Sequence, residues 1–337
     1  MATIRDVALV AGVSLSTVSN VMRGRSSVRE PIRQRVLQAA EQVGYLPDGL
    51  ARALRTGRSR SLALCVPFIT NPTVAGIIRG AARRAHAANY TLTICDLEND
   101  PQIEQTHLEL IAQQRAAAVI TLAASDEPST YQWFLDRGIP VVFVDRRPPG
   151  VAADFVTPDH RAGTEAAVRH LLESGRERIG LLTGPRSIGS SLVRIEGYRA
   201  AYAAAGEVAP EEGFISTGHR TSTEADAATR ALISAPYRAD AVVCGNASLT
   251  LGALSALRDV GVRIPDDVAL VGAGDVEWAR LVDPPLTMIQ VDAEALGENA
   301  VDLAIRRLAP KSAQDPPREI YLTAPLIVRA SSVIRRD

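Results

Sequence analysis

The feature that most constrains the fold is a repeated alternation of short apolar runs with helical patterns along residues 61–337. The runs that predict strands are 62–67, 91–95, 117–122, 140–144, 179–183, 241–244 and 268–272. The segments whose apolar residues recur with helical spacing include 74–88, 103–114, 161–174, 192–205, 223–234 and 248–260. Strands that alternate with helices predict an α/β fold in which helices cover both faces of parallel sheets.

The number of strands predicts more than one sheet. About ten strands would be long for a single sheet, so we expect two α/β lobes. The chain has 337 residues, which at roughly 100–200 residues per domain suggests two or three domains. Hydrophobic residues make up 46% of the chain, enough to build a sizeable core and to argue against wholesale disorder.

The first sixty residues differ from the rest in charge. They contain ten arginines and four acids, a balance of +6, whereas the whole chain has a net charge of -1, so the remainder carries -7. A basic segment attached to an acidic body is typical of a module that binds a polyanion. The alternative is a solvated charged face.

Apolar spacing in this basic segment predicts three short helices. The first begins near Ile4 and ends at Gly12, and Ser14 can cap the second by accepting a backbone N–H. The third covers 32–43 and ends at Gly44. Two short helices joined by a glycine turn predict a helix-turn-helix, whose second helix fits the major groove of DNA.

The motif T-I-R-D-V-A-L-V-A-G-V-S-L-S-T-V-S at 3–19 resembles the opening of the LacI/GalR family of bacterial transcription regulators. This resemblance implies a DNA-binding domain over 1–47; a helical bundle without a DNA role is the alternative. The DNA-contacting residues expected in it are Thr3, Ser14, Leu15, Ser16, Thr17, Ser19 and Asn20. Asn20 stands where many members place arginine, which removes a possible bidentate contact to guanine.

The segment G-Y-L-P-D-G-L-A-R-A-L-R-T-G at 44–57 resembles the hinge of the same family. A helix over 49–56 has about eight residues and is marginal alone, so we expect it to form only against a partner. The resemblance implies that two hinges, within 48–60, pack in the minor groove, where Leu54 wedges between base steps beside Ala51 and Arg55. An ordinary apolar anchor is the alternative for Leu54.

Residues 61–337 resemble the two-lobed, periplasmic-binding-protein-like core of this family. The motifs are V-G-A-G-D-V at 271–276, P-P-L-T at 284–287 and P-L-I-V-R-A-S-S at 325–332. The resemblance implies three crossings between the lobes, near 160, 288 and 323, and an effector in the cleft. No heptad helix follows the last motif, so we expect a homodimer.

Polar residues that follow the predicted strands are expected to meet in this cleft. The expected effector-binding residues that follow strands are Asn71, Asp145, Arg194, Asn246 and Asp275, and the resemblance implies effector contact for Arg194 and adds Thr73 and Arg220. Helix capping is the alternative role for Asn71 and Asn246, and a structural ion pair is the alternative for Asp145.

The cleft departs from the family pattern by losing acids and aromatic residues. Gly274 and Ala247 stand where acids are usual, and Thr73 and Val74 stand where aromatics are common. Arginines with little acid opposite them suit an anionic effector such as a sugar acid or a sugar phosphate. A neutral sugar is the equal alternative.

The sequence lacks the motifs that are typical of enzymes and of metal-binding proteins. The three cysteines are far apart and predict buried free thiols, and the histidines show no metal-ligand spacing. The loop at 184–191 resembles a phosphate loop but lacks its lysine, and no hydrolase elbow occurs. We therefore expect no enzyme, no cofactor and no metal.

The sequence predicts a ligand-responsive, sequence-specific transcriptional regulator that binds a pseudo-palindromic operator. The resemblance favours a repressor of a carbohydrate or sugar-acid utilisation operon. No signal peptide or long apolar run is present, so a cytoplasmic, nucleoid-associated protein is expected. The alternatives are a regulator controlled by a protein partner and a sugar-binding transport protein.

Overall fold

The computed structural model describes residues 2–22, 28–45, 59–274, 276–310, 312–313 and 315–333. The chain divides into two compact units, Met1–Ser59 and Arg60–Asp337, which we call the head and the body. The predicted hinge helix, with Ala51, Leu54 and Arg55, falls within 46–58 and so lies outside the described residues, as does Asp275.

The head contains the predicted helix-turn-helix. Its helices are α1 (Ile4–Ala11), α2 (Leu15–Met22) and α3 (Glu30–Gln42). Gly12 ends α1 in the left-handed conformation, with φ +61°, which glycine adopts without steric cost. The backbone N–H of Thr17 donates to Ser14 Oγ at 3.2 Å, so Ser14 caps α2 as predicted. Val7, Val18 and Val36 join the three helices in one core.

The body contains two six-stranded sheets. The first has the order β11-β5-β4-β3-β1-β2 and the second β12-β10-β9-β8-β6-β7. The first-sheet strands are β1 (Ser61–Val66), β2 (Thr91–Asp96), β3 (Ala118–Thr121), β4 (Val141–Val144), β5 (Asp154–Pro158) and β11 (Glu319–Leu322). The second-sheet strands are β6 (Ile179–Leu182), β7 (Ile215–Ser216), β8 (Ala241–Cys244), β9 (Ala269–Ala273), β10 (Thr287–Ile289) and β12 (Leu326–Ile327). All pairings are parallel except that of β12 with β10.

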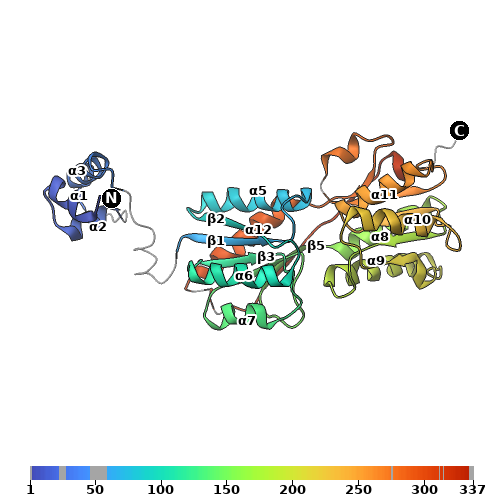
Figure 1. The fold of residues 1–337 in the computed structure, drawn as a ribbon, viewed down its shortest axis with the longest axis horizontal. Coiled ribbons are helices and arrows are strands. Elements are labelled where there is room, and N and C mark those ends of the chain that lie inside the picture. Colours follow the sequence, from blue (N-terminus) through green and yellow to red (C-terminus); the bar gives the residue numbers. More distant parts are fainter. Residues whose placement is uncertain are drawn as a thin grey trace. The chain divides into compact units, whose positions relative to one another are not determined.

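Helices cover both faces of each sheet, which confirms the predicted two-lobed α/β fold (Figure 1). In the first lobe α5 (Pro72–Ala87) and α12 (Ala293–Leu308) pack on one face, and α6 (Pro101–Gln113) and α7 (Ser129–Asp136) on the other. In the second lobe α8 (His160–Glu173) and α9 (Gly189–Ala205) pack opposite α10 (Ser222–Ile233) and α11 (Ala247–Asp259). Alternate side chains of β1 point to opposite faces of the first sheet. Leu64 packs in the core beside α5 and α12, and Cys65 packs in the core beside α6 and α7.

The chain crosses between the lobes in three places. It passes from β5 to α8 at Asp159, from β10 to α12 over 290–292, and from β11 to β12 over 323–325. The position near 288, where we expected the second crossing, lies inside β10. Each lobe is therefore built from two separate stretches of the chain.

The first lobe is closed by helix α12, which packs directly on α5. A Cβ added at Gly297 would lie 2.1 Å from the carbonyl oxygen of Ile77, so the two backbones touch where only glycine fits. The N–H groups of Arg307 on α12 donate to buried Asp154 at 2.6 Å and 2.8 Å. This ion pair ties the late helix to strand β5.

The cysteines and the helix lengths agree with further expectations. Cys65, Cys95 and Cys244 are buried and free, as predicted. No single helix in the described part of the chain is long and apolar enough to cross a membrane, although α1 and α2 pass that test together as a pair bent by 107°.

Candidate functional site

The first candidate site is the exposed face of α2 in the head. Val18 and Val21 are buried in the core, whereas Ser16 is exposed and Leu15 is 46% exposed. The exposed face at the start of α2 therefore carries short hydroxyl side chains and one leucine. Side chains of this size can approach the base edges in a major groove.

The remaining predicted DNA-contacting residues of the head have different surroundings. Thr17, Ser19 and Asn20 are half-buried on α2, next to the exposed Ser16. Thr3 caps α1: its N–H and its hydroxyl donate to Asp6 Oδ2 at 2.7 Å and 2.9 Å. The backbone and side-chain hydrogen bonds from Thr3 lower the pKa of Asp6. The hydroxyl hydrogen of Thr3 is therefore used within the head.

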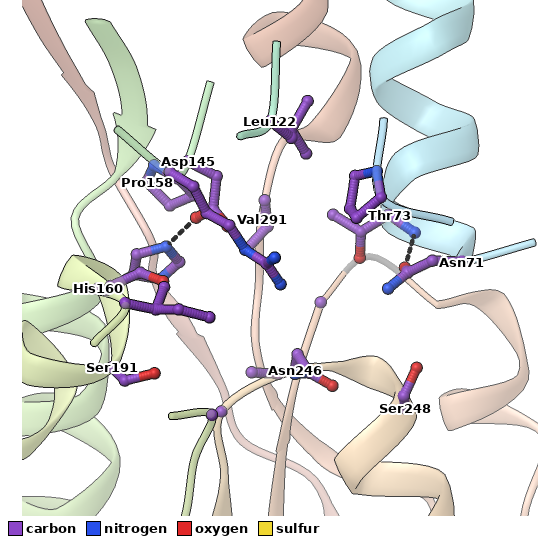
Figure 2. Close-up of a pocket in the computed structure, with 18 of the residues that line it drawn as sticks. Asn71, Thr73, Leu122, Asp145, Pro158, His160, Ser191, Asn246, Ser248 and Val291 are labelled. Carbon is purple, nitrogen blue, oxygen red and sulfur yellow. Dashed lines mark hydrogen bonds and ion pairs between the residues drawn. The ribbon is translucent and has the colours of Figure 1, made fainter. Parts of the chain in front are cut away.

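The second candidate site is a cavity between the two lobes of the body, at the carboxyl ends of the strands. Its volume is about 120 Å³. Figure 2 shows Asp145 and His160 facing Asn71 and Thr73 across the cavity, with Asn246 and Ser248 on a third side.

A bonded cluster of Asp145, His160 and Arg194 lies in this cavity. His160 Nε2 lies 2.5 Å from Asp145 Oδ1, and Arg194 Nη2 lies 3.0 Å from His160 Nδ1. Arg194 Nη2 also lies 3.3 Å from His160 Nε2, so it approaches both ring nitrogens, while Nε2 can donate to the carboxylate of Asp145. Asp145 belongs to the first lobe, Arg194 belongs to the second, and His160 begins the helix after the first crossing.

The charges of the cluster follow from its surroundings. Burial raises the pKa of Asp145, but His160, Arg194 and Arg146 outweigh it and hold that pKa well below the usual range. Burial and the charge of Arg194 lower the pKa of His160, against the opposing effect of Asp145. At neutral pH the cluster therefore contains a carboxylate, a neutral imidazole and a guanidinium.

The backbone aims Asp145 into the cavity. Asp145 has φ +61°, a left-handed conformation that aspartate tolerates better than most residues. Its N–H donates to the carbonyl of Val156 at 2.9 Å, so pairing with β5 fixes the turn that follows β4. The strained residue lies at the ligand-facing edge of the sheet, where such strain is often found.

Several helices begin at the wall of the cavity, and most of them are capped by a side chain. Asn71 Oδ1 accepts from Thr73 N at the start of α5, and Asn246 Oδ1 accepts from Leu249 N at the start of α11, each at 2.9 Å. Asp159 caps α8 in the same way. The capping role considered for Asn71 and Asn246 is therefore real, and both residues also line the cavity.

The structure brings most of the predicted effector residues to one place. The lining of the cavity includes Asn71, Thr73, Asp145, Arg194, Arg220 and Asn246. Asp275 lies outside the described residues, next to Gly274, which lines the cavity.

Among the lining residues that sequence reasoning missed, Arg146 and His160 carry the most chemistry. The signal for Arg146 was its position directly after Asp145. The signal for His160 was hidden because the preceding strand, β5, contains buried Asp154 and Thr157 and does not look apolar in the sequence.

Comparison with known protein families matches both units. Residues 3–48 match the family described as bacterial regulatory proteins, lacI family. Residues 168–332 match the periplasmic binding protein-like domain. The two matches therefore cover the head and much of the body.

Relatives of known function match nearly the whole chain. The ribose operon repressor of Escherichia coli (strain K12) is 33% identical over 333 residues, which are 98% of this chain and 100% of that protein. The transcriptional repressor PurR of Vibrio atlanticus (strain LGP32) is 30% identical over 335 residues, 99% of each chain. Both relatives are repressors by name.

Solved structures have the same fold. The transcriptional regulator CelR in complex with cellobiose has a TM-score of 0.74 and 29% identity, covering 98% of this chain and 100% of its own. The lac repressor dimer bound to operator has a TM-score of 0.85 at 23% identity, with 99% of both chains covered, and supports the fold alone. The chain belongs to the lacI family of bacterial regulatory proteins and is a DNA-binding transcriptional regulator.

Proposed function

We propose that this chain represses transcription from a pseudo-palindromic operator and that a small polar effector, bound between the lobes, changes its operator affinity. The observation that carries the proposal is the Asp145–His160–Arg194 cluster, because it joins polar groups of both lobes inside the cavity between them. A molecule that bonds to both lobes favours the arrangement in which they lie close together.

The lining favours a ligand with several hydroxyl groups. Asp145 supplies an acceptor and Arg194 supplies donors, while the amide group of Asn246 retains N–H donors because only its oxygen is used for capping. Leu122 and Ile289 add apolar surface against which a sugar ring can pack. Ribose and cellobiose appear in the names of two similar proteins, which supports a sugar-type effector.

For DNA we propose that two copies of the chain place one α2 each in neighbouring major grooves. A homodimer with two-fold symmetry would read a pseudo-palindrome, and the solved lac repressor complex is a dimer bound to operator. Leu15, Ser16 and Asn20 are the side chains proposed to meet base edges. Because the proposed partner is DNA, we propose that the chain acts at the nucleoid.

The mechanism follows from linkage between the two sites. If effector binding moves the lobes, it alters the spacing of the two hinge segments and so their fit to the operator centre. By thermodynamic reciprocity the operator must then change effector affinity by the same factor. Titration of the operator with and without effector measures whether the effector weakens or strengthens operator binding.

Selection of bound duplexes from a random pool by the full-length chain, at near-physiological salt, tests the proposal. We expect an enriched pseudo-palindrome, and we expect added sugars or sugar acids to change its affinity. Only salt-sensitive binding to bulk DNA would contradict operator recognition, because phosphate contacts alone carry no sequence information.

The hinge has a separate test. Leu54→Ala should weaken operator binding while effector binding is retained, since a wedge acts only in the DNA complex. Leu37→Ala, which truncates a leucine that is 44% exposed on α3, is the matched control. Equal operator affinities for the two variants would remove Leu54 from the site.

A further inference from the structure

Three arginines reach the cavity between the lobes. Arg146 follows β4 in the first lobe, whereas Arg194 on α9 and Arg220 before α10 belong to the second lobe. Asp145 is the only carboxylate among the described lining residues, and it is bonded to His160. Counting Asp275 with the cavity would still leave the arginines in excess. The lining is therefore positively charged.

Arg146 is half-buried and forms no ion pair with a described acid, although Asp145, Asp126 and Glu104 attract it electrostatically. Its Nη1 donates to Asn99 Oδ1 at 2.5 Å, a neutral acceptor, and it forms no ion pair with the described residues. Burial lowers the pKa of Arg146, Asp145 opposes this effect, and Arg220 lowers the pKa further. The two guanidinium groups therefore repel each other across the space between the lobes.

Arg220 is also unpaired, as far as the described residues show. Its backbone N–H donates to Glu224 at 2.6 Å, but its guanidinium group forms no ion pair. Asp126 lines the same small recess as Arg146 and Arg220, but it is exposed and forms no ion pair with either arginine. By contrast, Arg147, next to Arg146 in the chain, pairs with Glu319 at 2.7 Å.

Helix α9 adds partial positive charge at the same place. The residue before it, Ile188, stands at the capping position but makes no side-chain capping bond, whereas side chains cap α5, α8 and α11. Gly189 at the start of α9 lines a small recess together with Arg146 and Arg220. The free N–H groups and the dipole at the start of a helix favour an anion.

We propose, on the basis of the effector site proposed above, that the effector is an anion whose carboxylate or phosphate group binds between Arg146 and Arg220 at the start of α9. Guanidinium groups bind both kinds of oxyanion in a bidentate geometry. The hydroxyl groups of the same molecule would occupy the Asp145–His160–Arg194 side of the cavity.

The position of the anion site implies a closing function. Arg146 and Arg220 belong to different lobes, so without a ligand their repulsion favours separated lobes. An anion between them replaces repulsion with two attractions and draws the lobes together. The effector would then bind the closed lobes more tightly than the separated lobes, and its charged group would contribute more to this difference than its sugar ring.

Inorganic phosphate is a probe that does not require the effector to be known. Thermal unfolding of the full-length chain is compared in phosphate and in chloride at equal ionic strength. We expect phosphate to raise the unfolding temperature of the body, and Arg146→Gln or Arg220→Gln to weaken the apparent phosphate affinity at least about tenfold. The matched control is Arg186→Gln, because Arg186 lies in the same lobe as Arg220 and pairs with Glu212 at 2.6 Å.

An equal phosphate response in all four proteins, or none in the unsubstituted chain, would overturn the anion site. Competition against phosphate then identifies the charged group, using matched sugars, sugar acids and sugar phosphates. Competition by the acids or by the phosphate esters supports the proposal, and competition by neutral sugars alone overturns it. If neutral sugars alter operator affinity while phosphate has no effect, the anion inference fails but the proposed regulator stands.

Discussion

The exposed face of α2 and the cavity between the lobes differ in how their polar side chains are bonded before a partner binds. On α2, Ser16 is exposed, and its hydroxyl group forms a hydrogen bond with the hydroxyl group of Ser14 at 2.8 Å. In the cavity, Asp145, His160 and Arg194 are bonded to one another, with His160 buried and the other two half-buried. Side chains of the first kind act almost independently, whereas those of the second kind act as a unit.

This difference predicts how the two sites respond to substitution. Truncating an exposed side chain removes one contact with the partner. Truncating one member of a buried cluster also leaves its neighbours without the bonds that stabilised their charges. The following variants test that contrast.

The largest effect is expected from Arg194→Ala. Truncating one partner of a buried, hydrogen-bonded charge pair costs about 2–5 kcal/mol, so effector affinity should fall at least about thirtyfold. Operator affinity without effector should be nearly unchanged, as measured by operator titration with and without ligand. Arg199→Ala, on the same helix and paired with Glu212 at the surface, is the control. A normal effector response of the Arg194 variant would remove this residue from the site.

The next effect is a loss of stability in acid that depends on His160. Burial and Arg194 keep the pKa of folded His160 below the ordinary value of about 6.5. Between these values the unfolded chain binds a proton that the folded chain does not, so the free energy of unfolding falls as the pH drops below about 6.5, by up to about 1.4 kcal/mol per pH unit.

Urea unfolding between pH 7.5 and 5.5 measures this effect, and His160→Asn should flatten the profile. Burial lowers the pKa of His170 and His219 as well, so the slope should shrink without vanishing. His86→Asn, at an exposed position of α5, is the matched control. Identical profiles for the two variants would show that His160 does not carry the effect.

A smaller effect is expected from Ser14→Ala in the head. Losing the cap of α2 should cost about 1 kcal/mol of head stability, seen as earlier melting of the head while the body unfolds as before. Ser14→Asp should retain most of the stability, because aspartate is an equally good cap. Failure of this rescue would point to a role other than capping.

The smallest effect is expected from Ser16→Ala. The loss of one exposed hydrogen bond to DNA should weaken operator binding by about threefold to tenfold, without changing stability or effector binding. Gln38→Ala, at an exposed position of α3, should leave operator affinity unchanged. A large effect of Ser16→Ala on effector binding would break the contrast between independent and coupled sites.

Sequence patterns predicted the parts of this molecule that depend on nearby residues. The glycine turn at Gly12, the cap at Ser14 and the runs that became β1, β3 and β8 are all local features. Asp145 was found because it directly follows such a run, and Asn246 because only Gly245 separates it from one.

Features that depend on distant residues were missed. Strand β5 carries Asp154, whose burial becomes possible through Arg307, more than 150 positions away in the chain. Because β5 was missed, His160 was not placed at the mouth of the cavity. Arg146 has an ordinary sequence context, and its lack of an ion pair with a described acid became visible only with the surrounding side chains in place.

The interrupted path of the chain has a consequence for synthesis on the ribosome. The head and the whole of α5–β4 emerge early, but the face of the first sheet that carries Leu62 and Leu64 is covered by α12, which ends at Leu308. Helix α5 covers part of this face early, but until α12 leaves the exit tunnel the remainder of the apolar face is uncovered while most of the second lobe has already been made. Translation therefore completes the first lobe late, and a nascent chain that stalls before α12 exposes the apolar surface that chaperones bind.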